Sequence, residues 1–323
     1  MTRLSLKPFR LPAFAALVFA LAAPAWADYP EKPIRLIIPF AQGGATDAVG
    51  RMIAAPLEEA LGQAVVIVNQ PGAGGAVGLA NTVQARPDGY TLAIGSDSSL
   101  AARPLMTESG YTLEDLAPIA RLVEAPTGFA VRSDSPYQDL ASLVEAMKGG
   151  QLKWSSPGVG AGPHLAAEIF LDQFGLSATH ISSASGKDAL VKLLSGEVDF
   201  VSAAGSNFPS MLDEAAGAIR VLGLAGTERW VRMPEVPTFQ ELGFDFVRTQ
   251  WFGVVAPAGT PEDVLATLSA EIERILNDSS SDELLKRFHF SSAYQSPDEF
   301  RAQLERESTE LLPVLTKIGM AKK

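Results

Sequence analysis

The candidate functional residues lie in two glycine-rich loops, one in each half of the chain. The first loop spans residues 39–47 and contains Phe40, Gln42, Gly43, Gly44, Ala45, Thr46 and Asp47. The second loop spans residues 155–164 and contains Ser155, Ser156, Gly158, Gly160, Ala161 and His164. Each loop follows a strand-like apolar run and opens a helical pattern, which places backbone N–H groups and a helix N-terminus beside a ligand. The pair predicts a site for an anion, and ordinary tight turns are the alternative.

Motifs for cofactor, metal or nucleophile chemistry are weak in this chain. Residues 72–78 are glycine-rich, but Val77 stands where a dinucleotide-binding loop needs its last glycine. His164 and Glu168 are one helical turn apart, yet no third ligand is near, so a capping or surface role is favoured over metal binding. No nucleophile elbow and no phosphate-binding loop motif occurs in the sequence. We therefore expect neither a cofactor nor a metal.

Asp47 and Trp251 each allow two interpretations. Asp47 stands at a helix start, where capping is the ordinary role of an aspartate and general-base catalysis is the alternative. Trp251 adjoins an apolar strand, where core packing is expected and a place in a pocket wall is the alternative.

Composition excludes several classes of protein. The chain has 323 residues, of which 47% are hydrophobic and 20% charged, as expected for a globular protein with two domains. The formal charge of −11, without a basic stripe, argues against a nucleic-acid partner. Because there is no cysteine, disulfides, a thiolate nucleophile and cysteine-ligated metals are excluded.

The N-terminus has the pattern of a secretory signal peptide. Arg3, Lys7 and Arg10 precede an apolar run over residues 11–23, and an Ala-x-Ala cleavage sequence ends at Ala27. Cleavage after Ala27 takes the formal charge from −11 to −14, since these three cations are lost. No later run reaches the length of about 18 apolar residues that a membrane span needs, so we expect a soluble mature chain exported to the periplasm.

Strand-like and helical patterns alternate along the mature chain. Strands are expected at 34–39, 65–68, 91–94, 129–131, 153–155, 178–181, 199–201, 220–224 and 252–256. Helices are expected at 47–61, 75–85, 139–148, 163–174, 187–194, 261–277 and 297–317. This order predicts parallel sheets flanked by helices, with ligands at the carboxyl ends of the strands.

Short motifs follow one another in a fixed order over nearly all of residues 29–317. They are Tyr29–Arg35, Pro39–Asp47, Leu61–Gln63, Asn69–Gly75, Pro87–Leu92, His164–Glu168, Leu194–Asp199, Pro234–Thr238, Trp251–Gly253 and Ala256–Pro261. In this order they resemble the periplasmic substrate-binding proteins of the tripartite tricarboxylate transporter family, also called the Bug family. Each motif alone is weak, whereas the ordered set is specific.

The resemblance implies an α/β, two-lobed fold of the type II periplasmic binding protein kind (Venus flytrap), with two parallel-type sheets flanked by helices. It implies a discontinuous first domain, residues 28–128 plus 252–323, and a second domain, residues 129–251. Family members bind small organic carboxylates between the lobes and deliver them to the membrane subunits of a transporter. On this chain the two glycine-rich loops would form facing walls, and Gly95 and Ser96 a further wall. We expect the protein to be a monomer.

Two stretches of the second domain depart from the family pattern. Ser182–Ser185 stands where members commonly have Pro-Tyr-Lys-Gly, and Ser202–Gly205 where they commonly have Phe-Asp-Asn. The latter stretch includes the candidate site residues Ala203 and Ala204, which supply no acid for an ammonium group. We therefore expect a carboxylate ligand without an α-amino group. Lys187 is the candidate partner for a second carboxylate, and a solvated lysine is the alternative.

The predicted function is solute binding without catalysis. A ligand that touches both lobes stabilises the closed form, which the transporter recognises. A ligand sensor for a membrane receptor is one alternative. An exported enzyme that uses Asp47 or His164 on a small acid is the other.

Overall fold

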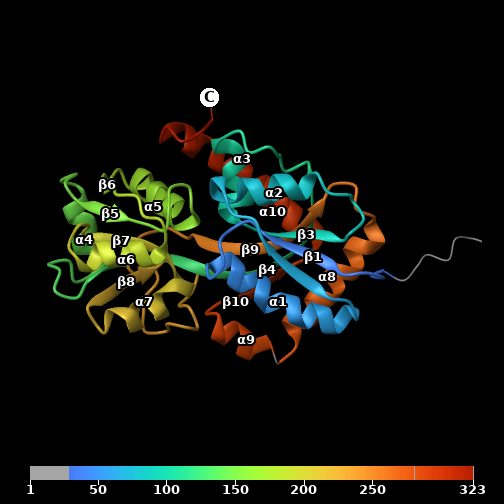
Figure 1. The fold of residues 1–323 in the computed structure, drawn as a ribbon. Coiled ribbons are helices and arrows are strands. Elements are labelled where there is room, and N and C mark those ends of the chain that lie inside the picture. The colour runs from blue at the N-terminus through green and yellow to red at the C-terminus, as the bar shows by residue number, and fades with distance from the viewer. Residues whose placement is uncertain (1–28, 280, 323) are drawn as a thin grey trace, which may run out of the picture.

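The protein consists of two lobes that lie side by side (Figure 1). The computed structural model describes residues 29–279 and 281–322. The predicted signal peptide at residues 1–27 lies outside this part of the chain. No helix within the described ranges has the length and apolar character needed to cross a bilayer.

The strands of the described residues form one hydrogen-bonded path. Their bounds are β1 Ile34–Ile38, β2 Val65–Asn69, β3 Thr91–Ser96, β4 Leu116–Arg132, β5 Lys153–Ser155, β6 Thr179–His180, β7 Phe200–Ala204, β8 Ile219–Leu224, β9 Thr249–Pro257 and β10 Ser291–Gln295. The order along the path is β2-β1-β3-β9-β4-β7-β5-β6, and β10 and β8 also pair with β4.

The helices cover both faces of this path. Their bounds are α1 Ala45–Leu61, α2 Ala76–Val83, α3 Arg103–Met106, α4 Leu140–Met147, α5 Gly162–Gln173, α6 Gly186–Leu194, α7 Phe208–Ala215, α8 Glu262–Asn277, α9 Ser281–Arg287 and α10 Pro297–Lys317. Three short helical turns precede helices: η1 Ala73–Gly75, η2 Asp97–Ala102 and η3 Gly205–Asn207.

The long strand β4 passes from one lobe to the other. Its residues 116–126 pair with β9, and its residues 127–132 pair with β7 or β8. We call β2, β1, β3, β9, β10 and the first part of β4 the first sheet, and the remaining strands with the second part of β4 the second sheet. The expected two-lobed α/β fold is confirmed. Each sheet is mixed, however, because β4 and β9 run antiparallel to their neighbours.

The length of β4 was not predictable from its residues. The sequence indicates a strand at 129–131 only, whereas β4 begins at Leu116 and is buried almost throughout. Pro118 and Pro126 interrupt the strand signal, since proline cannot donate to a sheet ladder. The pairing of β4 with β9 shifts register beside Pro118, and this irregularity accommodates the proline.

Apolar contacts hold the helices to the sheets. Strand β1 is buried at four of five positions, as expected for a central parallel strand covered on both faces. One face of the first sheet packs against α1 and α8, and the other packs against α2 and α10. In the second lobe Phe170 packs against Phe129, Phe239 and Phe246. These cores fix the strand ends from which the glycine-rich loops emerge.

Candidate functional site

Asp47 holds the first glycine-rich loop from within. Its Oδ2 accepts hydrogen bonds from the Gly43 N–H at 3.0 Å and from Arg51 Nε at 2.9 Å, and its Oδ1 accepts from Asn69 Nδ2 at 2.9 Å. Burial raises the pKa of Asp47, but the hydrogen bonds from Arg51, Gly43 and Asn69 outweigh it and keep the pKa below its usual value. A carboxylate with this many partners organises the loop and is not a free base.

The tip of the first loop leaves the start of α1 open. Gln42, Gly43 and Gly44 are exposed, Ala45 is half-buried and Thr46 is buried. Gly44 is the N-cap of α1, and no side chain caps the helix there. The first N–H groups of a helix have no partner within it, so they are free to bind a ligand at this end.

The ring of Phe40 connects the first loop to the loop after β2. A Cβ built on Gly75 would lie 3.2 Å from the Phe40 ring, which shows how closely the ring packs there. Asn69 Nδ2 also donates to the Phe40 carbonyl oxygen at 3.1 Å. Phe40 therefore fixes the first loop against its neighbour.

The second glycine-rich loop leads into α5, but unlike the tip of the first loop its residues 160 and 162–164 are buried. Ala161 is the N-cap of α5, its backbone is extended, and no side chain caps the helix. The Gly160 N–H donates to His164 Nδ1 at 3.3 Å, so this ring nitrogen carries no proton. Both loops thus present an uncapped helix N-terminus, one from each lobe.

Serine and histidine side chains join the second loop to the stretch after β6. Ser155 Oγ lies 2.7 Å from Ser183 Oγ, and Ser156 Oγ lies 3.0 Å from His180 Nε2. A Cβ built on Gly158 would lie 3.7 Å from the Ser183 carbonyl oxygen. Residues 155–164 and 180–183 therefore form one continuous wall.

His164 is a buried member of this wall and is a neutral imidazole. Its ring centroid is 4.4 Å from that of His180, and Trp154 packs against both rings. Burial, followed by the nearby His180, lowers the pKa of His164 to about 4. His164 Nε2 is 3.8 Å from Glu168 Oε1, and the described residues contain no group of three potential metal ligands.

The end of β3 brings the first lobe into contact with the second. Gly95 is packed inside, where an added Cβ would lie 2.4 Å from Leu100, and Ser96 is a cap whose N–H donates to Ser99 Oγ at 2.9 Å. Asp97, which follows them, was not identified from the sequence. A Cβ built on Gly162 would lie 2.6 Å from Asp97 Oδ2, so this carboxyl faces the N-terminus of α5.

Asp97 is buried with an unsatisfied oxygen. The residue is 6% exposed, and its Oδ1 has no hydrogen-bond partner in the described part of the chain. Burial, followed by the charge of Glu307, raises the pKa of Asp97 to about 7. The only hint in the sequence is an acid placed directly after a strand that ends at the site.

Arg103 was also not identified from the sequence as a site residue, although it lies between the two lobes. A Cβ built on Gly160 would be 3.1 Å from Arg103 Nη2, and one built on Gly74 would be 1.9 Å from the same nitrogen. The guanidinium therefore fills the space between the loop after β2 and the second glycine-rich loop. Since Phe40 packs on Gly75, Arg103 connects the predicted walls.

The remaining candidate residues lie apart from this constellation or behind it. Lys187 is exposed on α6, where its Nζ is 3.8 Å from Glu214 Oε2. Ala203 and Ala204 are buried in β7, opposite residues 128 and 127 of β4. Trp251 is 1% exposed and donates from Nε1 to Glu307 Oε1 at 2.9 Å, as expected for a core residue.

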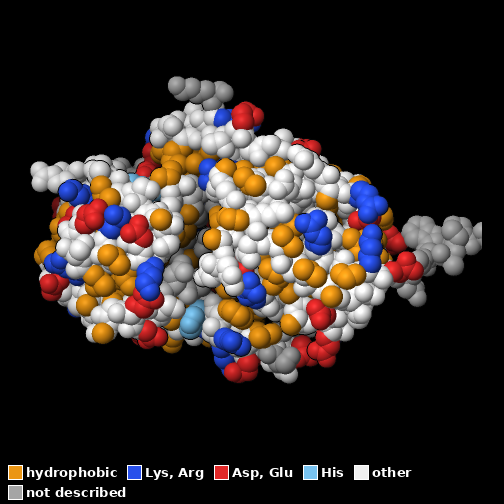
Figure 2. Space-filling view, in the orientation of Figure 1, with side chains coloured by type: hydrophobic (Ala, Val, Ile, Leu, Met, Phe, Trp, Pro, Cys, Tyr) orange, Lys and Arg blue, Asp and Glu red, His pale blue; other side chains and the backbone are white. Residues whose placement is uncertain are grey.

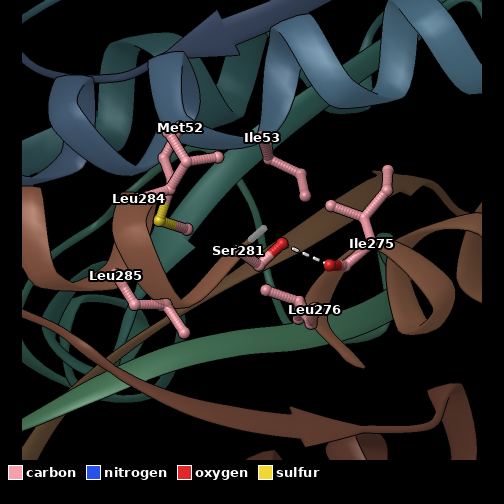
Figure 3. A pocket seen from close by; sticks show the side chains of 7 residues that line it. All are labelled: Met52, Ile53, Ile275, Leu276, Ser281, Leu284 and Leu285. Carbon is pink, nitrogen blue, oxygen red and sulfur yellow. Dashed lines mark hydrogen bonds between the residues drawn. The ribbon is translucent and has the colours of Figure 1, made fainter. Parts of the chain in front are cut away.

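Two hollows elsewhere on the molecule do not suit a ligand of the predicted kind. A cavity of about 10 Å³ lies between α1, α8 and α9 and is lined by Met52, Ile53, Ile275, Leu276, Ser281, Leu284 and Leu285 (Figure 3). It has room for about one water molecule at most. An open hollow of about 340 Å³ adjoins the far end of β4, at Arg132 and Leu194. By contrast, the surface between the lobes is visibly hollowed (Figure 2).

The two lobes, each with a helix N-terminus that no side chain caps, are typical of the class of two-lobed solute-binding proteins. The model of the tripartite tricarboxylate transporter family receptor matches residues 49–320, and the chain belongs to this family. BugT of Bordetella pertussis is 32% identical over 93% of this chain and 93% of its own length. The family membership expected from the sequence motifs is therefore confirmed, and proteins of this family are periplasmic.

Solved structures of the same kind are similar over most of the chain. Rpa4515 of R. palustris, solved with adipate, is 27% identical, with a TM-score of 0.82 over 91% of this chain and 99% of that one. MatC of Rhodopseudomonas palustris, solved with bound malate, is 28% identical, with a TM-score of 0.78 over 89% of this chain and 100% of that one. The chain is thus a solute-binding protein of the TctC and Bug type.

Proposed function

We propose that the mature protein captures a small organic carboxylate between its lobes and delivers it to the membrane subunits of a tripartite transporter. The observation that carries this proposal is the pair of uncapped helix starts, Gly44 of α1 and Ala161 of α5, one on each lobe. Adipate and malate, the ligands of two similar proteins, are carboxylates, which supports the same class of ligand here.

The helix starts supply a local attraction that the overall charge does not. Without residues 1–27 the chain carries a formal charge of −14, which repels anions at long range. Free N–H groups and the helix dipole act within the first turn and bind a carboxylate without a full counter-charge. A carboxylate that touches both lobes would favour the closed arrangement, because it bridges α1 and α5.

The proposal includes no catalysis. Asp47 is tied to three donors, and His164 Nδ1 accepts from Gly160. We further propose that the exported monomer begins at Asp28, and that its lobes are residues 28–128 plus 252–323 and residues 129–251. The change in the pairing of β4 after residue 126 supports the first of these crossing points.

A thermal-shift screen of the mature protein against organic acids tests the function. A ligand at 100 times its dissociation constant should stabilise the fold by about 2.7 kcal/mol. Mass spectrometry of the bound ligand should recover it unchanged, whereas an enzyme would release a product. Tight binding of a zwitterionic amino acid, with no response to simple carboxylates, would show that the proposed ligand class is wrong.

A further inference from the structure

Arg103 is a half-buried cation that has no counter-charge among the described residues. Its Nε is buried and has no partner, and its guanidinium makes no hydrogen bond or ion pair with the described residues. Leaving a buried charged donor unsatisfied is costly, and the usual compensation is an acid or a carbonyl oxygen. Here nothing in the described chain provides it.

The acids closest to Arg103 in sequence form no ion pair with it. Glu108 Oε1 lies 3.7 Å from Lys322 Nζ, and Asp97 faces Gly162 at the start of α5. The loops that flank the guanidinium are made of glycines. Gly74 has φ of +64° and Gly160 has φ of +78°, and a side chain on either would displace the arginine.

The chemistry of an unpaired arginine between two glycine loops suits a planar anion. A guanidinium offers paired N–H donors whose geometry matches a carboxylate. Arg103 adjoins Gly160 of the second loop, so an anion bound to it would lie beside the helix start proposed to hold the ligand. Lys187, which the sequence suggested as the partner of a second carboxylate, already faces Glu214, and its side chain is 76% exposed.

We propose that Arg103 binds the second carboxylate of a dicarboxylate whose first carboxylate is held at the helix starts. This inference rests on the proposed function and narrows its ligand to dicarboxylates. Arg103 is then the residue that distinguishes two-acid ligands from one-acid ligands of the same length.

Calorimetry of the mature protein with matched acids tests the role of Arg103. The pairs are adipate with hexanoate and succinate with butyrate, and the variants are Arg103→Gln and Arg103→Lys. Arg86→Gln is the control, because Arg86 is also in the first lobe and its side chain is 83% exposed beside Asp88. Circular dichroism and thermal unfolding establish that each variant is folded.

We expect the unmodified protein to prefer the dicarboxylate of at least one pair. Arg103→Gln should weaken the binding of that dicarboxylate about 10- to 100-fold, which is the range for a charged hydrogen bond. It should change the affinity for the monocarboxylate less than about 3-fold. The dicarboxylate affinity of Arg103→Lys should lie between those of the unmodified protein and Arg103→Gln, since lysine keeps the charge but loses the paired donors. Arg86→Gln should bind as the unmodified protein does.

Several results would overturn the inference. If Arg103→Gln weakens both members of a pair equally, Arg103 supports the fold or the first carboxylate and does not select dicarboxylates. If the unmodified protein binds both members alike and Arg103→Gln changes neither, the proposed function stands and the inference is wrong. If no carboxylate binds to the unmodified protein, the proposed function fails, and the inference with it.

Discussion

Replacing Asp97 by asparagine should make the protein more stable at neutral and alkaline pH. Asp97 is 6% exposed, and burial raises its pKa from the ordinary 3.8 to about 7. The folded chain therefore keeps a proton that the unfolded chain releases near pH 4. Ionising this buried carboxyl costs at most about 4 kcal/mol of folding free energy, the value of a pKa difference of about three.

The sign of the pH dependence follows from which state binds the proton. Between about pH 4 and pH 7 the folded chain binds more protons at Asp97 than the unfolded chain does. The free energy of unfolding should therefore fall as the pH rises through this window. Asp97→Asn does not titrate, so its stability relative to the unmodified protein should increase from pH 5 to pH 8, by about 2 to 3 kcal/mol.

Urea unfolding of the mature protein, followed by tryptophan fluorescence at pH 5, 6, 7 and 8, measures this difference. Asp134→Asn is the matched control, because the Asp134 side chain is 76% exposed beside Arg132. The comparison is made between variants, so titrations common to both cancel. If Asp97→Asn is less stable than the unmodified protein at pH 8, the carboxylate is ionised and stabilised by α5, and the argument from burial is refuted.

Further substitutions and the predicted processing site give separate tests. Mass spectrometry of the exported protein should show an N-terminus at Asp28, and an intact leader would contradict cleavage after Ala27. Gly44→Phe should abolish carboxylate binding in calorimetry and change the unfolding free energy by less than about 1 kcal/mol. Gly44 has φ of −84°, and an added Cβ would lie 3.6 Å from the Ala41 carbonyl oxygen, which is an ordinary contact. Retained binding would exclude the α1 start as the site. His164 has a pKa of about 4, so the free energy of unfolding should fall by up to about 3 kcal/mol as the pH drops from 6.5 to 4. In urea unfolding, His164→Gln should remove this fall in the free energy of unfolding at acid pH. If the free energy of His164→Gln falls as steeply between pH 6.5 and 4 as that of the unmodified protein, His164 is not the group responsible. Lys187→Gln should change the dicarboxylate affinity less than about 3-fold in calorimetry. A larger loss would show that Lys187, and not Arg103 alone, binds the second carboxylate.

The sequence predicted most of the elements in order, and both glycine-rich loops, because those features are local, but it gave no indication of α3, α7, α9 or β10. Short apolar runs bounded by turn residues identify β1 and β3, and glycines before a helical pattern identify the starts of α1 and α5. The full length of β4 was missed because its prolines disfavour a strand in the sequence pattern, while its residues 116–126 are held as a strand by pairing with the distant β9.

Asp97 and Arg103 were missed for a different reason. A charged residue after a strand is normally solvated, and nothing in its neighbours in sequence indicates otherwise. Asp97 is buried because α5 of the other lobe covers it, and Arg103 because Gly74 and Gly160 approach it from separate loops. Such contacts depend on the arrangement of the two lobes, which no single segment encodes.

The position of β9 has a consequence for the order in which the chain folds. β3 pairs with β1 on one edge and with β9 on the other, so the first sheet lacks its central strand until residues 249–257 have emerged. The second sheet needs only residues 127–224 and can be completed earlier. Until residues 249–257 are available, more than a hundred positions later in the chain, the unpaired edge of β3 is exposed, which invites misassembly with other chains. A holding chaperone that covers residues 91–96 would protect the chain during this interval.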